Sequence, residues 1–206
     1  MPSTLKFPDG IRLAHLDELP GPGSDRAAAW ARIQSANIAP GFTLSESTDS
    51  RFAFYAEANV DGPRIWAVFR DLCQGLLGRE ATLIISEIDD EPMPLGSAHT
   101  LGILALLEPH QYQLAHDGCL QFGLVGRDTD LLTEVFVAPT KHFKVWLSDV
   151  KCLRSVLRSH AVPEVERLEF IDEYPRTTTR LSGDKVSFRV DSELIEHLEK
   201  QLRALS

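Results

Sequence analysis

The stretch YQLAHDGCLQFGLVGRDTDLLTEVFVAPTKHFKVWL, residues 112–147, decides the fold class of this chain. It contains four short runs in which apolar residues alternate with others, and the runs are 112–116, 119–125, 133–138 and 142–147. Asp-Gly separates the first two runs, which is a strong hairpin signal because both central residues of the turn take positive φ. Pro-Thr-Lys separates the last two. The stretch therefore predicts an antiparallel meander of four strands.

The flanking segments predict helices and further strands. Residues 51–58 alternate around aromatic side chains, as in a strand. Asp61-Gly62-Pro63 then opens a helix whose apolar residues recur with a period near 3.6, and 81–88 reads as a buried strand. Three more helices are expected, at 98–107, at 150–161 after Asp149, and at 191–205. Together these segments predict an α+β fold with a mainly antiparallel sheet and helices packed on one face.

The first part of the chain differs in character from the rest. LPGPG at 19–23 breaks regular structure, and DRAAAWARIQSA at 25–36 suits one short helix, which Ala-Pro-Gly ends at 39–41. We expect residues 1–41 to form an N-terminal arm with a short helix. Residues 42–206 are then expected to form a single α+β domain.

Composition excludes some classes of function. The net charge is −9, from 21 Lys and Arg against 30 Asp and Glu, which disfavours nucleic-acid binding. Cys73, Cys119 and Cys152 are few and scattered, which points to reduced thiols. The N-terminal residues show no secretory signal, and no apolar run approaches the roughly 20 residues that span a bilayer. We therefore expect a cytoplasmic protein that does not bind membranes.

Motifs for metal, cofactor or nucleophilic chemistry are not found. The seven histidines show no metal-ligand spacing, and there is no Walker A, G-x-G-x-x-G or G-x-S-x-G pattern, so no cofactor and no metal are expected. His116, Asp117 and Cys119 lie close together at the first predicted hairpin turn. His116 and Asp117 would point to opposite faces of a strand, so the group indicates a turn and not a catalytic site.

One acid–base arrangement remains as an alternative. Glu134, His142 and Asp172 could form the site of a small enzyme if the three side chains converge in one pocket, with the histidine as general base or acid. The same residue types are expected on exposed faces and at strand ends for solubility alone.

The preferred interpretation is a small acidic protein that acts by binding another protein with a basic surface, as immunity and inhibitor-type proteins do. Two acidic segments could form the contact surface, because complementary charge accelerates association. The predicted contact residues are Asp89, Asp90, Glu91, Asp172, Glu173 and Tyr174. A homodimer is a further possibility, through an open edge of the meander that carries Phe143 and Trp146.

Overall fold

The computed structural model describes residues 4–21, 23–128, 131–183, 186, 188 and 190–205. Its helices are α1 (Gly23–Ser35), α2 (Ile65–Leu76), α3 (Thr100–Leu107), α4 (Gln111–His116), α5 (Val150–Ser159) and α6 (Asp191–Leu205). Its strands are β1 (Ile11–Leu13), β2 (Gly41–Glu46), β3 (Phe54–Asn59), β4 (Glu80–Glu87), β5 (Met93–His99), β6 (Leu120–Asp128), β7 (Leu131–Val137), β8 (Phe143–Leu147) and β9 (Arg176–Thr178). Short 3-10 turns lie at Leu16–Glu18, Gly62–Arg64, Glu108–His110 and Ile171–Glu173.

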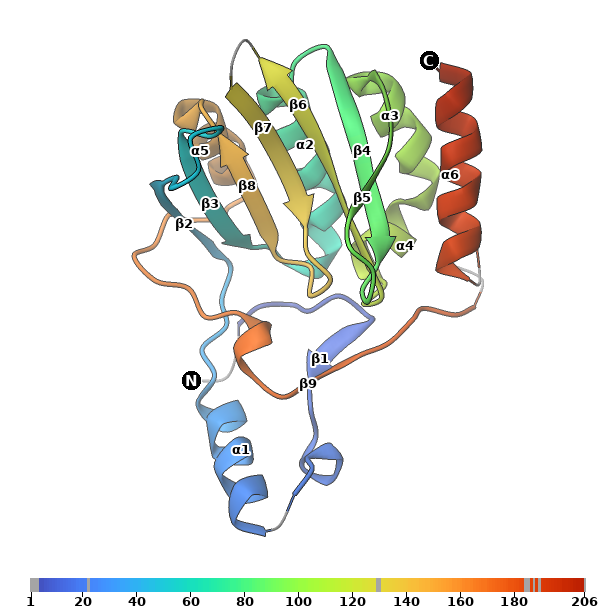
Figure 1. Ribbon diagram of the computed structural model, residues 1–206. Helices are drawn as coiled ribbons and strands as arrows, with labels where there is room; N and C mark the ends of the chain where they lie inside the picture. The colour runs from blue at the N-terminus through green and yellow to red at the C-terminus, as the bar shows by residue number, and fades with distance from the viewer. Residues whose placement is uncertain are drawn as a thin grey trace.

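Within the described residues, seven strands form one antiparallel sheet in the order β2-β3-β8-β7-β6-β4-β5. Helices α2 to α6 pack against one face of this sheet, and none of the described helices covers the opposite face, which we call the uncovered face (Figure 1). The predicted fold class, α+β with a mainly antiparallel sheet and helices on one face, is confirmed.

The core lies between the sheet and α2, and residue spacing explains why. Residues of α2 that recur every three or four positions point toward the sheet, and Ile65, Phe69 and Leu72 are fully buried. Phe69 meets Phe122 of β6 edge to face, with ring centroids 4.8 Å apart. Alternate residues of each strand face these helices, so the residues between them lie on the uncovered face.

The N-terminal arm packs below the sheet and not on it (Figure 1). Its strand β1 pairs with β9, and Ile11 packs with Ile38 and Ile171 in a small apolar cluster of their own. Arg32 of α1 donates a hydrogen bond to the backbone oxygen of Glu173. The short helix expected for the arm is present, and the arm contacts the chain between β8 and α6.

The first predicted hairpin is wrong, so the meander has three strands, β6, β7 and β8, in place of four. Residues 111–116 form α4. Pro109 does not end the helical segment, because it sits in the first turn of a 3-10 segment, where proline is tolerated. Leu114 and Ala115 are thereby buried in the core. The second predicted hairpin, between β7 and β8, is confirmed.

The structural basis given for a homodimer is also wrong. Strand β8 lies inside the sheet, between β3 and β7, and its Phe143 is fully buried. The edge strands are β2 and β5, neither of which the sequence interpretation had identified as a strand. Association of two copies remains a prediction without this support.

Candidate functional site

One row of side chains crosses the whole uncovered face. The strand register places one residue of each strand side by side in the order Ser45, Tyr55, Trp146, Glu134, Val125, Thr82 and Ser97. We call these seven residues the central row. Neighbouring strands lie about 4.8 Å apart, so adjacent members of the row are in contact distance.

Aromatic side chains occupy one half of the central row. The rings of Tyr55 and Trp146 lie 4.9 Å apart at 39°, and Phe52 approaches Trp146 at 6.0 Å from the loop between β2 and β3. Arg51 lies over the Phe52 ring at 5.5 Å and forms a bidentate ion pair with Asp49. Phe52 is buried, whereas Tyr55 and Trp146 are partly exposed, and partly exposed aromatic residues are typical anchors in protein interfaces.

Glu134 stands at the centre of the row, between Trp146 and Val125. Its side chain forms no hydrogen bond or ion pair with another described residue. Burial raises the pKa of its carboxyl group, and the positive charge of Arg51 partly offsets this effect. A half-buried carboxylate without a partner is an unfavourable arrangement in a protein surface.

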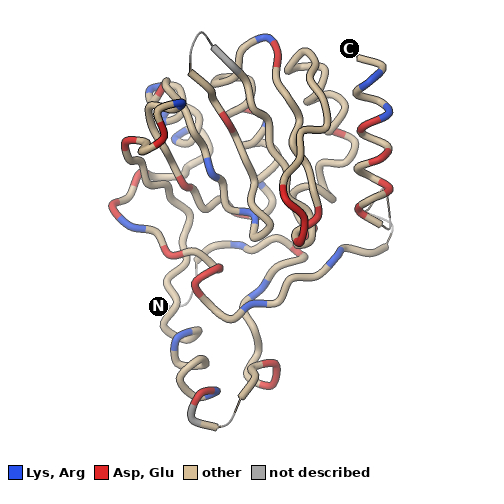
Figure 2. The backbone as a smooth tube through the Cα atoms, in the orientation of Figure 1, with Lys and Arg blue, Asp and Glu red and all other residues tan. Residues whose placement is uncertain are grey.

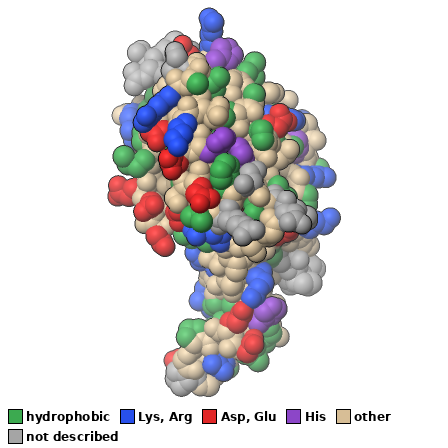
Figure 3. All heavy atoms as spheres, turned by 90° about the vertical axis from the view of Figure 1, so that its right-hand side faces the viewer, with side chains coloured by type: hydrophobic (Ala, Val, Ile, Leu, Met, Phe, Trp, Pro, Cys, Tyr) green, Lys and Arg blue, Asp and Glu red, His purple; other side chains and the backbone are tan. Residues whose placement is uncertain are grey.

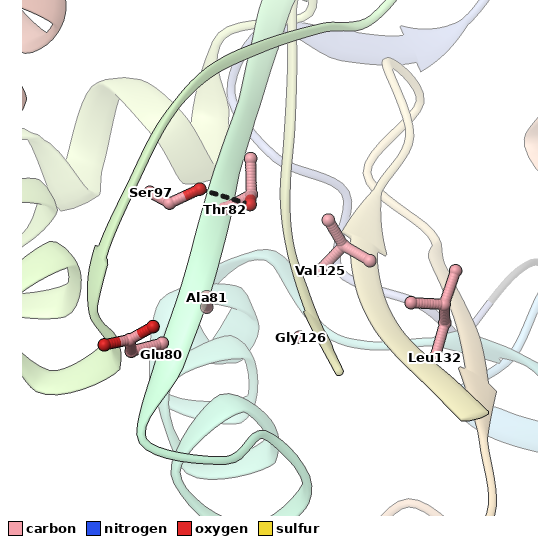
Figure 4. A pocket seen from close by; sticks show the side chains of 7 residues that line it. All are labelled: Glu80, Ala81, Thr82, Ser97, Val125, Gly126 and Leu132. Atoms are coloured by element: carbon pink, nitrogen blue, oxygen red, sulfur yellow. Dashed lines mark hydrogen bonds between the residues drawn. The ribbon is translucent and has the colours of Figure 1, made fainter. Parts of the chain in front are cut away.

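A cavity of about 370 Å³ continues the row beyond Glu134 (Figure 4). Thr82 and Ser97 share a hydrogen bond of 2.7 Å on one side of it, and Val125 and Leu132 form the apolar side. Glu80, Ala81 and Gly126 complete the lining. The cavity can accept a small apolar group with one polar contact.

An acidic turn borders the uncovered face at the lower end of β4 and β5 (Figure 2). Gln121 points from this face, and its Nε2 donates to Ser86 Oγ and to the backbone oxygens of Glu87 and Asp90 at 3.0 to 3.2 Å. These bonds hold the turn against the sheet. Figure 3, in which the uncovered face lies at the left-hand edge, shows acidic side chains gathered there.

The predicted residues Asp89, Asp90 and Glu91 are the tip of this turn, and all three are exposed. None of the three side chains makes an ion pair or hydrogen bond with another described residue. Glu87, at the base of the turn, is instead paired with Arg180 at 2.7 Å. Three uncompensated carboxylates on a fixed turn can attract a basic surface.

The other predicted contact residues have partners within the chain. Asp172 Oδ2 lies 3.9 Å from His142 Nδ1, and Glu173 accepts a hydrogen bond from the Phe170 amide at 2.8 Å. The Tyr174 hydroxyl donates to Glu169 at 2.6 Å, and this bond raises the Tyr174 pKa to about 12. These three residues lie between the arm and the sheet, so partner contact by them stays a prediction.

The residues of the enzyme alternative do not all converge. His142 is buried, and Thr140 Oγ1 and Asp172 Oδ2 both approach the same atom, His142 Nδ1, at 3.1 and 3.9 Å. A relay of the serine-protease type needs partners on both ring nitrogens. Glu134 pairs across the strands with Trp146, which lies four residues along the chain from His142. Glu134 is therefore about 13 Å from His142, measured along the strand. The structure thus brings His142 and Asp172 together and leaves Glu134 on a different part of the sheet.

His116, Asp117 and Cys119 have structural roles. His116 stacks on Tyr112 at 4.6 Å, and Asp117 is fully buried, where it accepts hydrogen bonds from the amides of Cys119 and Leu181. Burial raises the Cys119 pKa, so a smaller fraction of this thiol is present as the reactive thiolate. Among the described residues, no group of three or more His, Cys, Asp or Glu side chains is arranged to hold a metal ion.

Sequence reasoning missed the central row, although part of the signal was visible. The alternation in 51–58 and 142–147 already put Tyr55 and Trp146 on the side opposite the core. The second predicted hairpin already put Glu134 on the strand beside that of Trp146, but the register of this hairpin and the place of β3 beside β8 could not be deduced. Gln121 gave no signal, because its role depends on backbone oxygens of a turn 31 to 34 positions away.

None of the helices in the described part of the chain has the length and apolar character needed to cross a membrane. Comparison of the chain with models of known protein families, with curated proteins and with solved structures finds no significant match.

Proposed function

We propose that this protein acts by binding another protein that has a basic surface, in the manner of an immunity or inhibitor-type protein. The observation that carries the proposal is the uncovered sheet face, which presents aromatic side chains and is bordered by an acidic turn. The expected location is the cytoplasm, in keeping with three free cysteines among the described residues.

Aromatic side chains and negative charge both favour binding at this face. The uncovered face supplies rigid aromatic anchors such as Tyr55 and Trp146, which lose little conformational entropy on binding. The three carboxylates at the tip of the acidic turn have no ion-pair partner among the described residues, so no internal ion pair has to break before they contact basic side chains of the binding partner. Its backbone is already held by Gln121, so ordering the turn costs little when a partner binds.

The experiment is capture of partner protein from a lysate of the source cells, followed by affinity measurement with the purified partner. The test variant is Asp89→Asn/Asp90→Asn/Glu91→Gln, which keeps the shape of the turn. Exposed ion pairs contribute about 0.2 to 1 kcal/mol each, so loss of three should weaken binding on the order of tenfold. The effect should be larger at about 0.02 M salt than at about 0.15 M.

A control variant distinguishes the effect of the charges on the acidic turn from the effect of the net charge of the protein. Glu108→Gln/Glu166→Gln/Glu193→Gln removes the same charge from exposed sites on other parts of the surface. It should leave the affinity within about twofold. Equal weakening by both variants would mean that only net charge matters, and no loss in the turn variant would remove the turn from the interface.

A further inference from the structure

Glu134 is the feature of the uncovered face that solubility does not explain. A charged residue placed for solubility extends into water, whereas this carboxylate is half-buried in the middle of the sheet, beside the Trp146 indole. It has no hydrogen-bond or ion-pair partner among the described residues. Such a group is costly in the free protein, and a cation brought by a binding partner would offset the cost.

We propose that Glu134 and Trp146 together receive an arginine side chain of the protein partner. The inference rests on the proposed function and names the chemical group that the centre of the interface recognises. The guanidinium would donate two parallel hydrogen bonds to the Glu134 carboxylate and lay its flat face on the indole of Trp146. Tyr55, 4.9 Å from Trp146, closes the other side of the aromatic surface.

Arginine fits this site better than lysine for two reasons. Its planar fork matches a carboxylate in bidentate geometry, and its delocalised charge stacks on aromatic rings, whereas the lysine ammonium is a strongly hydrated point charge. The same face already shows this combination once within the chain. Arg51 stacks over Phe52 at 5.5 Å while it pairs with Asp49 through its fork.

The neighbouring cavity indicates a second side chain that the partner would place near the arginine. Thr82, on the cavity wall, lies two strands from Glu134 along the central row, or about 10 Å. About three residues of extended chain span that distance. The cavity, with Val125 and Leu132 on its apolar side, would accept a small apolar side chain of the same segment.

The test uses three short peptides as probes, Ac-Leu-Gly-Gly-Arg-amide and its versions with citrulline or lysine in place of arginine. Citrulline keeps the planar shape and removes the charge. Binding is followed by NMR, through the indole signal of Trp146 and the carboxyl signal of Glu134. The arginine peptide should shift both signals to saturation, the lysine peptide should bind several times more weakly, and the citrulline peptide should not shift them.

Glu134→Gln should weaken binding of the arginine peptide about tenfold or more, because hydrogen bonds to charged groups contribute most to such contacts. Glu46→Gln, at the end of β2, is the control with the same change of charge on the same sheet. The carboxyl titration of Glu134 adds a second readout, since its pKa should be raised in the free protein and fall when the arginine peptide binds.

The possible results distinguish a failure of the arginine site from a failure of the proposed function. No shift at Trp146 with the arginine peptide, or equal affinity for the lysine peptide, would overturn the arginine assignment, even if the acidic-turn variant loses its partner. A lowered Glu134 pKa in the free protein would show an internal cation on the carboxylate and would also overturn it. If the peptide results hold while the turn variant binds its partner normally, the turn is removed from the proposed function and the arginine site stands.

Discussion

Lys141 offers the sharpest test of the energetics of this fold. It lies in the turn between β7 and β8 with φ of 63°, and its side chain is among the largest that are fully buried. Its Nζ donates to the Leu120 backbone oxygen at 2.6 Å and lies 5.6 Å from the centre of the Phe122 ring. Burial lowers the Lys141 pKa from 10.5 to about 7, although the carboxylates of Asp117 and Asp191 act in the opposite direction.

This shift makes the stability of the protein depend on pH with a definite sign. Because the Lys141 pKa is lower in the folded state, this side chain binds more protons in the unfolded chain between pH 7 and 10.5, so its contribution to the free energy of unfolding rises with pH in that window. Burial of the amine then costs about 4 kcal/mol at pH 7. The cost falls by about 2 kcal/mol between pH 7 and about pH 8.5.

The perturbation is Lys141→Met, which keeps an unbranched side chain of similar length and removes the titrating group. The Leu120 oxygen loses its hydrogen bond, which costs about 1 to 2 kcal/mol. The backbone strain at positive φ is the same for both residues and cancels. We expect the variant to be more stable than the wild type by about 2 to 3 kcal/mol at pH 7, and this advantage to shrink by about 2 kcal/mol at pH 8.5.

The assay is urea unfolding at several pH values, followed by circular dichroism. Burial also raises the pKa of Cys73, and this lowers stability as pH rises, but the effect is common to both proteins and cancels in their difference. Lys151→Met, on the exposed surface of α5, is the control and should run parallel to the wild type. Parallel curves for wild type and Lys141→Met would refute the argument, because they would mean that Lys141 stays charged in the folded protein.

Two further predictions concern the uncovered face and the docking of α6. Gly123→Ala should destabilise the protein by about 1 to 3 kcal/mol in urea unfolding, because the added Cβ would lie 2.7 Å from the Phe136 ring and from the Val135 backbone oxygen. Unchanged stability would show that both neighbours shift without cost. His110→Phe should raise the stability of the protein, because His110 Nδ1 is buried without a partner among the described residues. Burial and nearby His197 lower the His110 pKa, so the variant should also lose less stability than the wild type below about pH 6.5. An equally steep loss of stability at acid pH in both proteins would contradict this.

The fold class was predictable because most of its elements carry local signals. Strand β3, helix α2 and strand β4 each follow one period of apolar residues. Asp149 caps α5 as expected, with its Oδ1 accepting from the amides of Lys151 and Cys152 at 3.0 Å. These features depend on residues within one or two turns of the chain, so a sequence alone contains them.

The predictions were wrong where contacts between residues distant in the sequence override the local pattern of apolar residues. Residues 112–116 alternate like a strand, but burial of Leu114 against the helical layer makes them α4. β5 contains Pro94 and Gly96 and lies at an edge, where proline interrupts no pairing on its outer side, so its sequence resembles a loop. Such segments take their structure from neighbours that the sequence does not identify.

The candidate site shows the same limit more strongly, because its chemistry is created by strand order. Glu134 on its own is an ordinary polar residue on an outward-facing position of a strand. It becomes a candidate recognition residue only when the register of the β7–β8 hairpin puts Trp146 directly beside it, when β3 adds Tyr55 on the far side of Trp146, and when none of the described helices covers the face they share. An unpaired carboxylate beside an indole lowers the stability of the free protein, so its position is best explained by an interaction that the free protein does not make.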